Sequence, residues 1–182
     1  MSKFILGILF IALSFSACDN SNKKEIEEVE SLIARVNETE KVLLSIDTSK
    51  VFGITRLLEK DLAEFKKIKD TLTKDEAFTV ADYFGSKKKF YRLTAGYPRF
   101  IGQIETSKKQ LSNLKQDLQN GLIKKDDYIS FYQEEQAIFK DLNFQINKLI
   151  TGIDLVVDKY ENDRPELLKF MKELKLKATE NE

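Results

Sequence analysis

The sequence of 182 residues contains no histidine and only one cysteine, Cys18. The missing histidine excludes Ser-His-Asp triads, Cys-His nucleophiles, zinc sites of the usual nitrogen and sulfur type, and the Glu-x-x-His ligands of di-iron bundles. The sequence also has no glycine-rich phosphate-binding loop. We therefore predict no catalytic residues, no metal site and no cofactor. An enzyme that uses carboxylates is the least favoured of the function classes considered.

The scarcity of cysteine and proline also constrains the fold. A single cysteine cannot form an intramolecular disulfide, so the stability of the fold must come from packing. Only two prolines are present, Pro98 and Pro165, and Leu, Lys, Glu and Ile are abundant, which favours helix. The length suits one domain, and the 42% hydrophobic and 33% charged residues are typical of a soluble domain with a core. Because 30 basic residues balance 30 acidic ones, net charge gives no bias toward nucleic acid.

Residues 1–17 have the pattern of a secretory signal peptide. Lys3 supplies one positive charge, and the segment from Phe4 to Phe15 is uncharged and mostly apolar. This apolar segment is shorter than the roughly 20 residues that a membrane-spanning helix needs. A signal peptide therefore fits better than a permanent span.

The motif "SFSAC", which ends at Cys18, resembles the lipobox of bacterial lipoproteins. The resemblance implies that Cys18 carries a thioether-linked diacylglycerol, becomes the first residue after cleavage and is acylated on its amine. It implies a location in the cell envelope, anchored to a bacterial membrane, and leaves open which membrane and which face. Phe15 departs from the leucine that is commoner at its position. The alternatives are an ordinary signal peptide with a chance cysteine, or a buried thiol.

Residues 18–23 are predicted to be the lipidated cysteine and its tether, and residues 24–174 a helical bundle domain. Apolar residues recur at alternating spacings of three and four, which is typical of helices that pack as coiled coils. The stripes are Ile26, Val29, Ile33, Val36 and Leu43; Val51, Ile54, Leu58, Phe65, Ile68 and Leu72; Phe100, Ile104, Leu111, Leu114 and Leu118; and Tyr128 to Tyr160. The predicted fold is all-α, an antiparallel bundle of long helices with coiled-coil-like heptad packing.

Local signals predict where these helices begin and end. Capping boxes are expected at Asn22 with Glu25 and at Thr73 with Glu76, and a turn at "SIDTSK". Pro98 predicts a kink or a new helix, and Asn120-Gly121 a left-handed stop. The stripe from Tyr128 to Tyr160 predicts one continuous helix, ended by "ENDRPE" with Asp163 as the next cap and followed by a short helix to about Leu174. Residues 175–182 are predicted to be disordered, and residues 74–96 fit either a long helix or a short crossover.

Each long stripe carries one polar residue at a predicted core position, namely Glu40, Asp61, Ser107 and Glu135. A carboxylate cluster that binds a divalent cation is one explanation. The other is that these residues set the register of the helices or reach solvent at the edge of a seam. We favour the second explanation, because Glu40 and Asp61 lie at different distances from the turn that joins their helices.

Residues 85–100 are basic and aromatic and contain no acidic residue. Such a segment can hold an anionic surface, namely phospholipid headgroups, an acidic glycan or a phosphate-bearing polymer of the envelope. It can equally be a solvated helix face whose aromatic residues pack into the bundle. The candidate ligand-binding residues are Lys87, Lys88, Lys89, Tyr91, Arg92, Tyr97 and Arg99.

Residues 90–160 also resemble small helical lipoproteins of Bacteroidota-type bacteria whose function is uncharacterised, which implies an all-helical fold in the same compartment. The sequence thus predicts a lipid-anchored envelope lipoprotein that acts as a non-enzymatic structural or protein-interaction module, with a protein partner in the envelope. The alternative is an envelope protein that binds an anionic ligand or polymer through residues 85–100.

Overall fold

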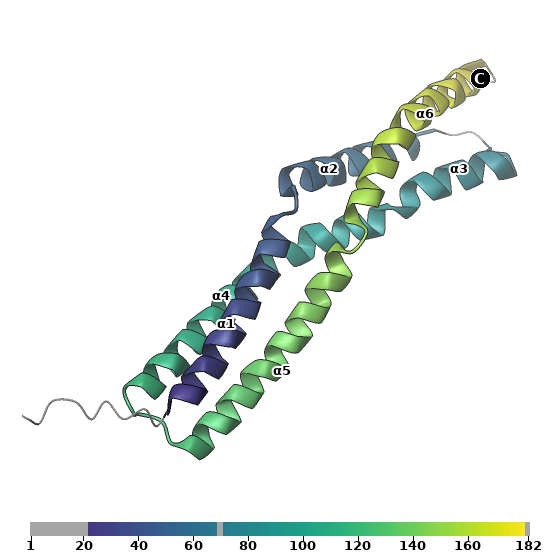
Figure 1. The fold of residues 1–182 in the computed structure, drawn as a ribbon. Helices are drawn as coiled ribbons and strands as arrows, with labels where there is room; N and C mark the ends of the chain where they lie inside the picture. Colours follow the sequence, from purple (N-terminus) through teal and green to yellow (C-terminus); the bar gives the residue numbers. More distant parts are fainter. Residues whose placement is uncertain (1–21, 69–70, 181–182) are drawn as a thin grey trace, which may run out of the picture.

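The computed structural model describes residues 22–68 and 71–180. Within these ranges the chain forms helices and no strand (Figure 1), which confirms the predicted all-α bundle. The helices are α1 (Lys23–Leu44), α2 (Thr48–Phe65), α3 (Lys74–Gly85), α4 (Lys87–Gln119), α5 (Lys125–Ile150) and α6 (Ile153–Glu180).

The helices follow one another in pairs, so that the bundle consists of three long rods (Figure 1). The pair α1 and α2 runs along the molecule, α3 and α4 run back, and α5 and α6 run forward again. The start of α1 and the turn between α4 and α5 lie at one end, which we call the proximal end. The end of α6 and the start of α3 lie at the other, distal end.

The buried side chains recur at the alternating spacings of four and three that the sequence predicted. In α4 the proximal half buries Phe100, Ile104, Ser107, Leu111, Leu114 and Leu118. In α1 the buried set is Glu25, Val29, Leu32, Val36, Thr39 and Leu43. The seam of α1 therefore keeps three residues of the predicted stripe, Val29, Val36 and Leu43. At the alternate positions the preceding residues, Glu25, Leu32 and Thr39, are the buried ones. Glu40 lies at the edge of the seam, half-buried, with its Oε2 2.7 Å from Lys108 Nζ.

Two hydrophobic cores lie one beyond the other along the rods. The proximal core joins α1, α5 and the second half of α4, and the distal core joins α2, α3, α6 and the first part of α4. Three partly buried residues, Ile46, Leu149 and Ile150, pack against both cores. Each core therefore has its own set of buried side chains, and among the helices that the structure describes only α4 supplies buried residues to both.

Three of the predicted helix boundaries are confirmed by their hydrogen bonds or backbone angles. Asp47 Oδ1 accepts a hydrogen bond from the Lys50 backbone N–H at 2.9 Å and caps α2. Thr73 and Glu76 form the predicted capping box at the start of α3. Gly121 follows the end of α4 and has a φ of 64°, a value that glycine adopts without strain.

The prediction of one continuous helix from Tyr128 to Tyr160 is wrong. The helix α5 ends at Ile150, and α6 begins at Ile153 after Gly152, whose φ is 72°. The apolar pattern hides this break because its members on both sides, from Ile146 through Ile153, still pack into the bundle. Residues 74–96 form neither one long helix nor a short crossover, since α3 and α4 are separate helices that meet at Ser86.

Of the two alternatives for Pro98, a kink or a new helix, the new helix is wrong, and the helix end predicted before Pro165 is also wrong. No helix begins at Pro98, which lies inside α4, and Pro165 lies inside α6. The helix α6 runs to Glu180, so the disorder predicted beyond Leu174 does not hold for residues 175–180. Its last turns are tied to neighbouring helices, because Lys175 Nζ lies 3.2 Å from Glu64 Oε2 and Lys177 Nζ 3.5 Å from Glu76 Oε1.

Candidate functional site

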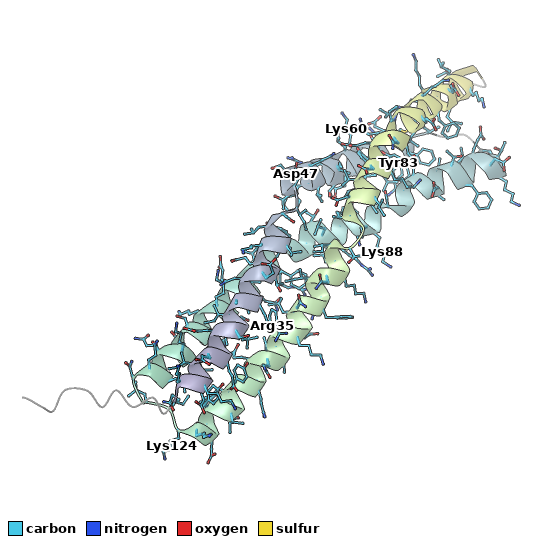
Figure 2. All side chains as sticks on the ribbon, viewed as in Figure 1. Arg35, Asp47, Lys60, Tyr83, Lys88 and Lys124 are labelled. Atoms are coloured by element: carbon cyan, nitrogen blue, oxygen red, sulfur yellow. The ribbon has the colours of Figure 1, made fainter. Side chains whose placement is uncertain are left out.

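All seven candidate ligand-binding residues lie in the first half of α4, on different sides of the helix. Lys88, Arg92 and Arg99 are exposed, and their spacings of four and seven residues place them on one face. We call this set the outer face of α4; Lys88 is labelled in Figure 2. Lys89, Tyr91 and Tyr97 turn toward neighbouring helices, and Lys87 lies over the ring of Tyr91 on α4 itself. The structure therefore does not bring the seven residues together into one cluster.

Lys89 contacts the end of α5. Its Nζ donates a hydrogen bond of 2.5 Å to the backbone carbonyl of Thr151, the residue that follows α5. The carbonyl end of a helix carries partial negative charge, so a lysine in this position is favourable. Lys89 therefore joins α4 to the break between α5 and α6.

Two other cations of the segment lie over aromatic rings of α4 itself. Lys87 Nζ is 4.9 Å from the centre of the Tyr91 ring, and Arg99 Cζ is 4.6 Å from the centre of the Phe100 ring. Cation–π contacts of this kind at partly exposed sites contribute about 0.5–1 kcal/mol. They orient the two side chains along the helix surface.

Tyr91 lines an open groove between α2 and α4 with a volume of about 550 Å³. The hydroxyl oxygens of Thr55 and Thr94 lie 3.0 Å apart across the two helices. Burial, together with a hydrogen bond to Glu59, raises the pKa of Tyr91. Arg56 and Glu59 give the groove one cation and one anion. The lining residues are Phe52, Thr55, Arg56, Glu59, Tyr91, Thr94 and Ala95.

Tyr97 lies outside this lining and contacts its proximal edge. The rings of Tyr97 and Phe52 meet edge to face, with their centres 6.4 Å apart. Six lining residues were missed by the sequence prediction, namely Phe52, Thr55, Arg56, Glu59, Thr94 and Ala95. The four from α2 become neighbours of the α4 residues only because the two helices pair. The sequence offers one signal for the position of this groove. Thr55 and Thr94 each follow a residue that is buried in the bundle, Ile54 and Leu93, so each threonine lies near a helix contact.

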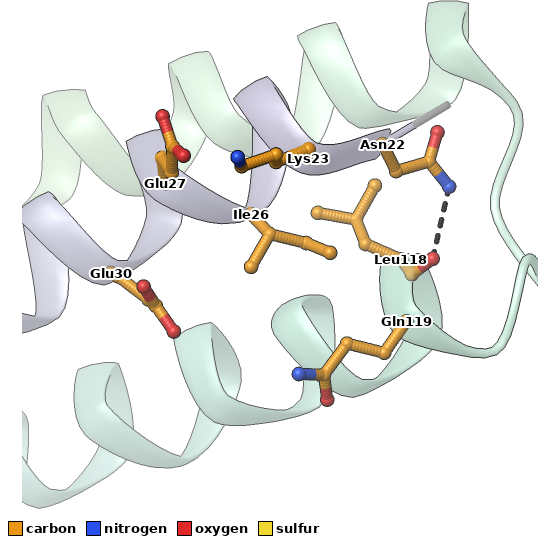
Figure 3. Close-up of a pocket in the computed structure, with 7 residues that line it drawn as sticks. All are labelled: Asn22, Lys23, Ile26, Glu27, Glu30, Leu118 and Gln119. Atoms are coloured by element: carbon orange, nitrogen blue, oxygen red, sulfur yellow. Dashed lines mark hydrogen bonds between the residues drawn. The ribbon is translucent and has the colours of Figure 1, made fainter. Parts of the chain in front are cut away.

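A smaller hollow of about 290 Å³ lies at the proximal end, between the start of α1 and the end of α4 (Figure 3). Its lining residues are Asn22, Lys23, Ile26, Glu27, Glu30, Leu118 and Gln119. The predicted capping box is absent, since the Asn22 side chain makes no capping bond. Its Nδ2 instead donates a hydrogen bond of 2.9 Å to the Leu118 carbonyl, which ties the first residues of the bundle to the end of α4.

The polar residue of α2, Asp61, belongs to a buried cluster at the distal end. Arg164 of α6 donates two hydrogen bonds to its carboxylate, from Nε at 2.8 Å and from Nη2 at 3.1 Å. The Tyr83 hydroxyl donates a third at 3.0 Å. Burial raises the pKa of Tyr83, and the proximity of Tyr160 and Asp61 raises it further. The cluster connects α2, α3 and α6.

The polar residues of the proximal half have other surroundings. Ser107 and Glu135 are buried in α4 and α5. One carboxyl oxygen of Glu135 has no hydrogen-bond partner among the described residues, and burial, with a contribution from Glu134, raises the pKa of this carboxyl. Among the residues that the structure places, no group of three acidic or sulfur-bearing side chains could hold a metal ion.

The candidate lipidation site, Cys18, lies outside the described residues. Within residues 22–68 and 71–180, no helix is long and apolar enough to cross a membrane.

The described residues offer three surfaces, namely the groove between α2 and α4, the outer face of α4 and the proximal hollow. Comparison of the chain with protein-family models, with curated protein sequences and with solved structures finds no match.

Proposed function

We propose that the protein is a lipoprotein of the bacterial cell envelope, anchored through Cys18, that acts as a non-enzymatic structural or protein-interaction module. The lipobox-like motif motivates the anchor. The observation that carries the proposal is the position of the first bundle residues. Asn22 is bonded to Leu118 at the proximal end of a long bundle, so an anchor at Cys18 is attached to one end of the rods.

The short tether limits how far the proximal end can lie from the membrane. Three residues lie between Cys18 and Asn22, so four peptide units join them, and an extended chain of that length reaches about 14 Å. The helix α4 alone, with its 33 residues, is about 50 Å long at 1.5 Å per residue. A protein held in this way keeps its proximal end at the membrane and can present the sides and the distal end of the bundle to a partner.

The anchor is tested by substituting Cys18→Ser and fractionating cells. We expect the wild-type chain to float with membranes in a density gradient and to incorporate a labelled fatty acid. The Cys18→Ser variant should lose the label and leave the membrane fraction. Asn20→Ser, which changes the tether and keeps the thiol, is the matched control. A Cys18→Ser variant that floats as the wild type does would disprove the lipid anchor.

The interaction role is tested by cross-linking in native envelopes. A photoreactive residue replaces exposed Ala95, beside the groove and the outer face of α4, or exposed Ala137 on α5 as a control. The proposal expects a cross-link to one envelope protein from Ala95 that the Cys18→Ser variant does not make. The same products from both positions would argue against a specific partner at α4.

The outer face of α4 favours a second candidate function, the binding of an anionic ligand or polymer. Lys88, Arg92 and Arg99 are exposed on one face, and Arg99 lies 11 positions after Lys88, about 17 Å along the helix. Inorganic polyphosphate is a suitable probe, because it follows such a row of cations without a specific pocket. The proposal places Lys89 outside the ligand contacts, since its ammonium group already contacts Thr151.

The test compares two triple variants of equal charge. We expect Lys88→Ser, Arg92→Ser and Arg99→Ser together to weaken polyphosphate binding at least tenfold at low salt. The control, Lys109→Ser, Lys124→Ser and Lys140→Ser, removes three exposed cations from other positions. Equal weakening by both variants would show that only net charge matters and would remove the outer face as a site.

A further inference from the structure

Two of the three rods are interrupted where the two cores meet, and the remaining rod contains a proline there. The first rod breaks at Ser45–Asp47, between α1 and α2, and the third at Thr151–Gly152, between α5 and α6. The second rod continues as α4 and contains Pro98. Proline has no N–H group, so α4 lacks the backbone hydrogen bond that residue 98 would otherwise donate to Thr94.

Direct contacts place these interruptions at one level of the bundle. A Cβ atom added at Gly96 of α4 would lie 3.2 Å from Leu149 Cδ2, near the end of α5. Tyr97 contacts Phe52 in the first turns of α2. Lys89 Nζ donates to the Thr151 carbonyl between α5 and α6. The region from Lys89 to Pro98 therefore lies beside both breaks.

The packing on either side of this level is largely separate. The residues that contact both cores are Ile46, Leu149 and Ile150, and all three are only partly buried. Figure 1 shows that α2 runs in a different direction from α1, whereas α4 passes through the level without a break. Helices bend most readily at proline, and halves joined by few contacts can change their mutual angle at low cost.

We propose that this level is a hinge about which the distal half of the bundle bends relative to the proximal half, with α4 flexing at Pro98. This inference goes beyond the proposed function and does not depend on the anchor. Lys89 limits the bending, because its contact with Thr151 ties α4 to the break in the third rod. The edge-to-face contact of Phe52 and Tyr97 lies at the hinge, so bending separates these rings and opens the proximal edge of the groove.

The hinge is tested by measuring distance distributions between pairs of spin labels in the purified full chain. Cys18→Ser removes the only native thiol. One pair, Ala34→Cys and Ala81→Cys, has a label in each half, and the control pair, Ala34→Cys and Ala137→Cys, lies within the proximal half; all three positions are exposed. We expect the distribution across the hinge to be at least about twofold wider than that of the control pair.

Three variants then identify the elements of the hinge. Pro98→Ala restores a backbone donor to α4 and should narrow the distribution across the hinge, whereas Lys89→Met removes the tie to Thr151 and should widen it. Lys109→Met, on the proximal half of α4, should leave it unchanged. Helix content from circular dichroism verifies that each variant is folded. Equal widths for the two label pairs, or a wide distribution that neither Pro98→Ala nor Lys89→Met alters, would overturn the hinge.

Discussion

Asp61 is 3% exposed, and its charge is balanced by Arg164, a residue 103 positions later in the chain. Removing one partner of a buried ion pair leaves the other charge without compensation. We predict that Arg164→Met lowers the free energy of unfolding by about 3 kcal/mol, measured by urea denaturation. Adding Asp61→Leu to Arg164→Met should recover most of this loss, because no charge then remains buried.

The matched control for this pair is Arg99→Met. Arg99 is exposed and lies over the ring of Phe100 on its own helix, so its loss should change the free energy of unfolding by no more than about 0.5 kcal/mol. If Arg164→Met were as stable as Arg99→Met, the pair with Asp61 would contribute nothing to the fold.

Glu135 makes the stability of the protein depend on pH. Burial raises the pKa of its carboxyl above the ordinary value of 4.5, so the folded state binds this proton more tightly than the unfolded state does. The free energy of unfolding contributed by Glu135 therefore falls as the pH rises from about 4.5 through the raised pKa. We predict that Glu135→Gln gains about 1 kcal/mol relative to wild type at pH 7, with the gain vanishing near pH 4.

The comparison between variant and wild type isolates this effect, since other carboxylates act with the opposite sign. A hydrogen bond from Lys67, for example, lowers the pKa of Glu64, so that contribution is lost at low pH. The control is Glu105→Gln, at an exposed position of α4. A gain for Glu135→Gln that is independent of pH would contradict the titration.

At the scale of the helix elements, Gly152 and Gly53 give opposite predictions for the same substitution. Gly152 has a φ of 72° between α5 and α6, so an alanine there is strained. We predict that Gly152→Ala lowers the free energy of unfolding by about 1–2 kcal/mol. Gly53 lies inside α2, and an added Cβ would meet nothing within 4 Å, so Gly53→Ala should raise it by about 0.5–1 kcal/mol.

Thermal unfolding of the two variants is a direct check, because the expected shifts have opposite signs. If both substitutions lowered the melting temperature by similar amounts, the prediction that residue 53 tolerates a Cβ atom would be wrong. Two gains would mean that residue 152 readily adopts another conformation and that the break between α5 and α6 does not depend on glycine.

Helix boundaries set by neighbouring residues could be predicted from the sequence, as the caps at Asp47 and Thr73 show. Boundaries that depend on distant residues could not. Proline inside a helix costs about 3 kcal/mol, but Pro165 is followed by Leu167 and Met171, which are buried in the distal core and offset that cost. The helix break at Gly152 was not predicted, because the apolar pattern of the sequence continues across it.

The candidate site shows the same limit. The composition of residues 85–100 is visible in the sequence, but the direction of each side chain depends on which helices surround α4. Lys89 contacts Thr151, 62 residues away, and Tyr91 faces α2, whereas Arg92 faces outward. The sequence could identify cations on one helix, but it could not separate the ones that contact neighbouring helices from the ones that are exposed to solvent.

At the scale of the whole molecule, the sequence predicted long antiparallel helices, and the division into two cores appears only in the structure. Near the same level of the bundle, each rod either passes from one helix to the next or contains a proline. No single apolar stripe in the sequence reveals this shared level. The two cores share only partly buried residues. Sequence periodicity alone describes a uniform bundle, whereas the packing divides it into two units linked by α4.

Because the two cores are separate, we predict that a destabilising substitution in one core promotes local unfolding mainly in its own half of the bundle. Leu58 and Leu111 are both 0% exposed, Leu58 in the distal core and Leu111 in the proximal core. Truncating either residue to alanine should cost about 2–5 kcal/mol. In native-state hydrogen exchange, Leu58→Ala should speed exchange in α2 and α6 at least tenfold more than in α1 and α5, and Leu111→Ala should do the reverse. Equal acceleration in α1 and α6 by both variants would mean that the contacts of Ile46, Leu149 and Ile150, together with α4, couple the cores into one cooperative unit.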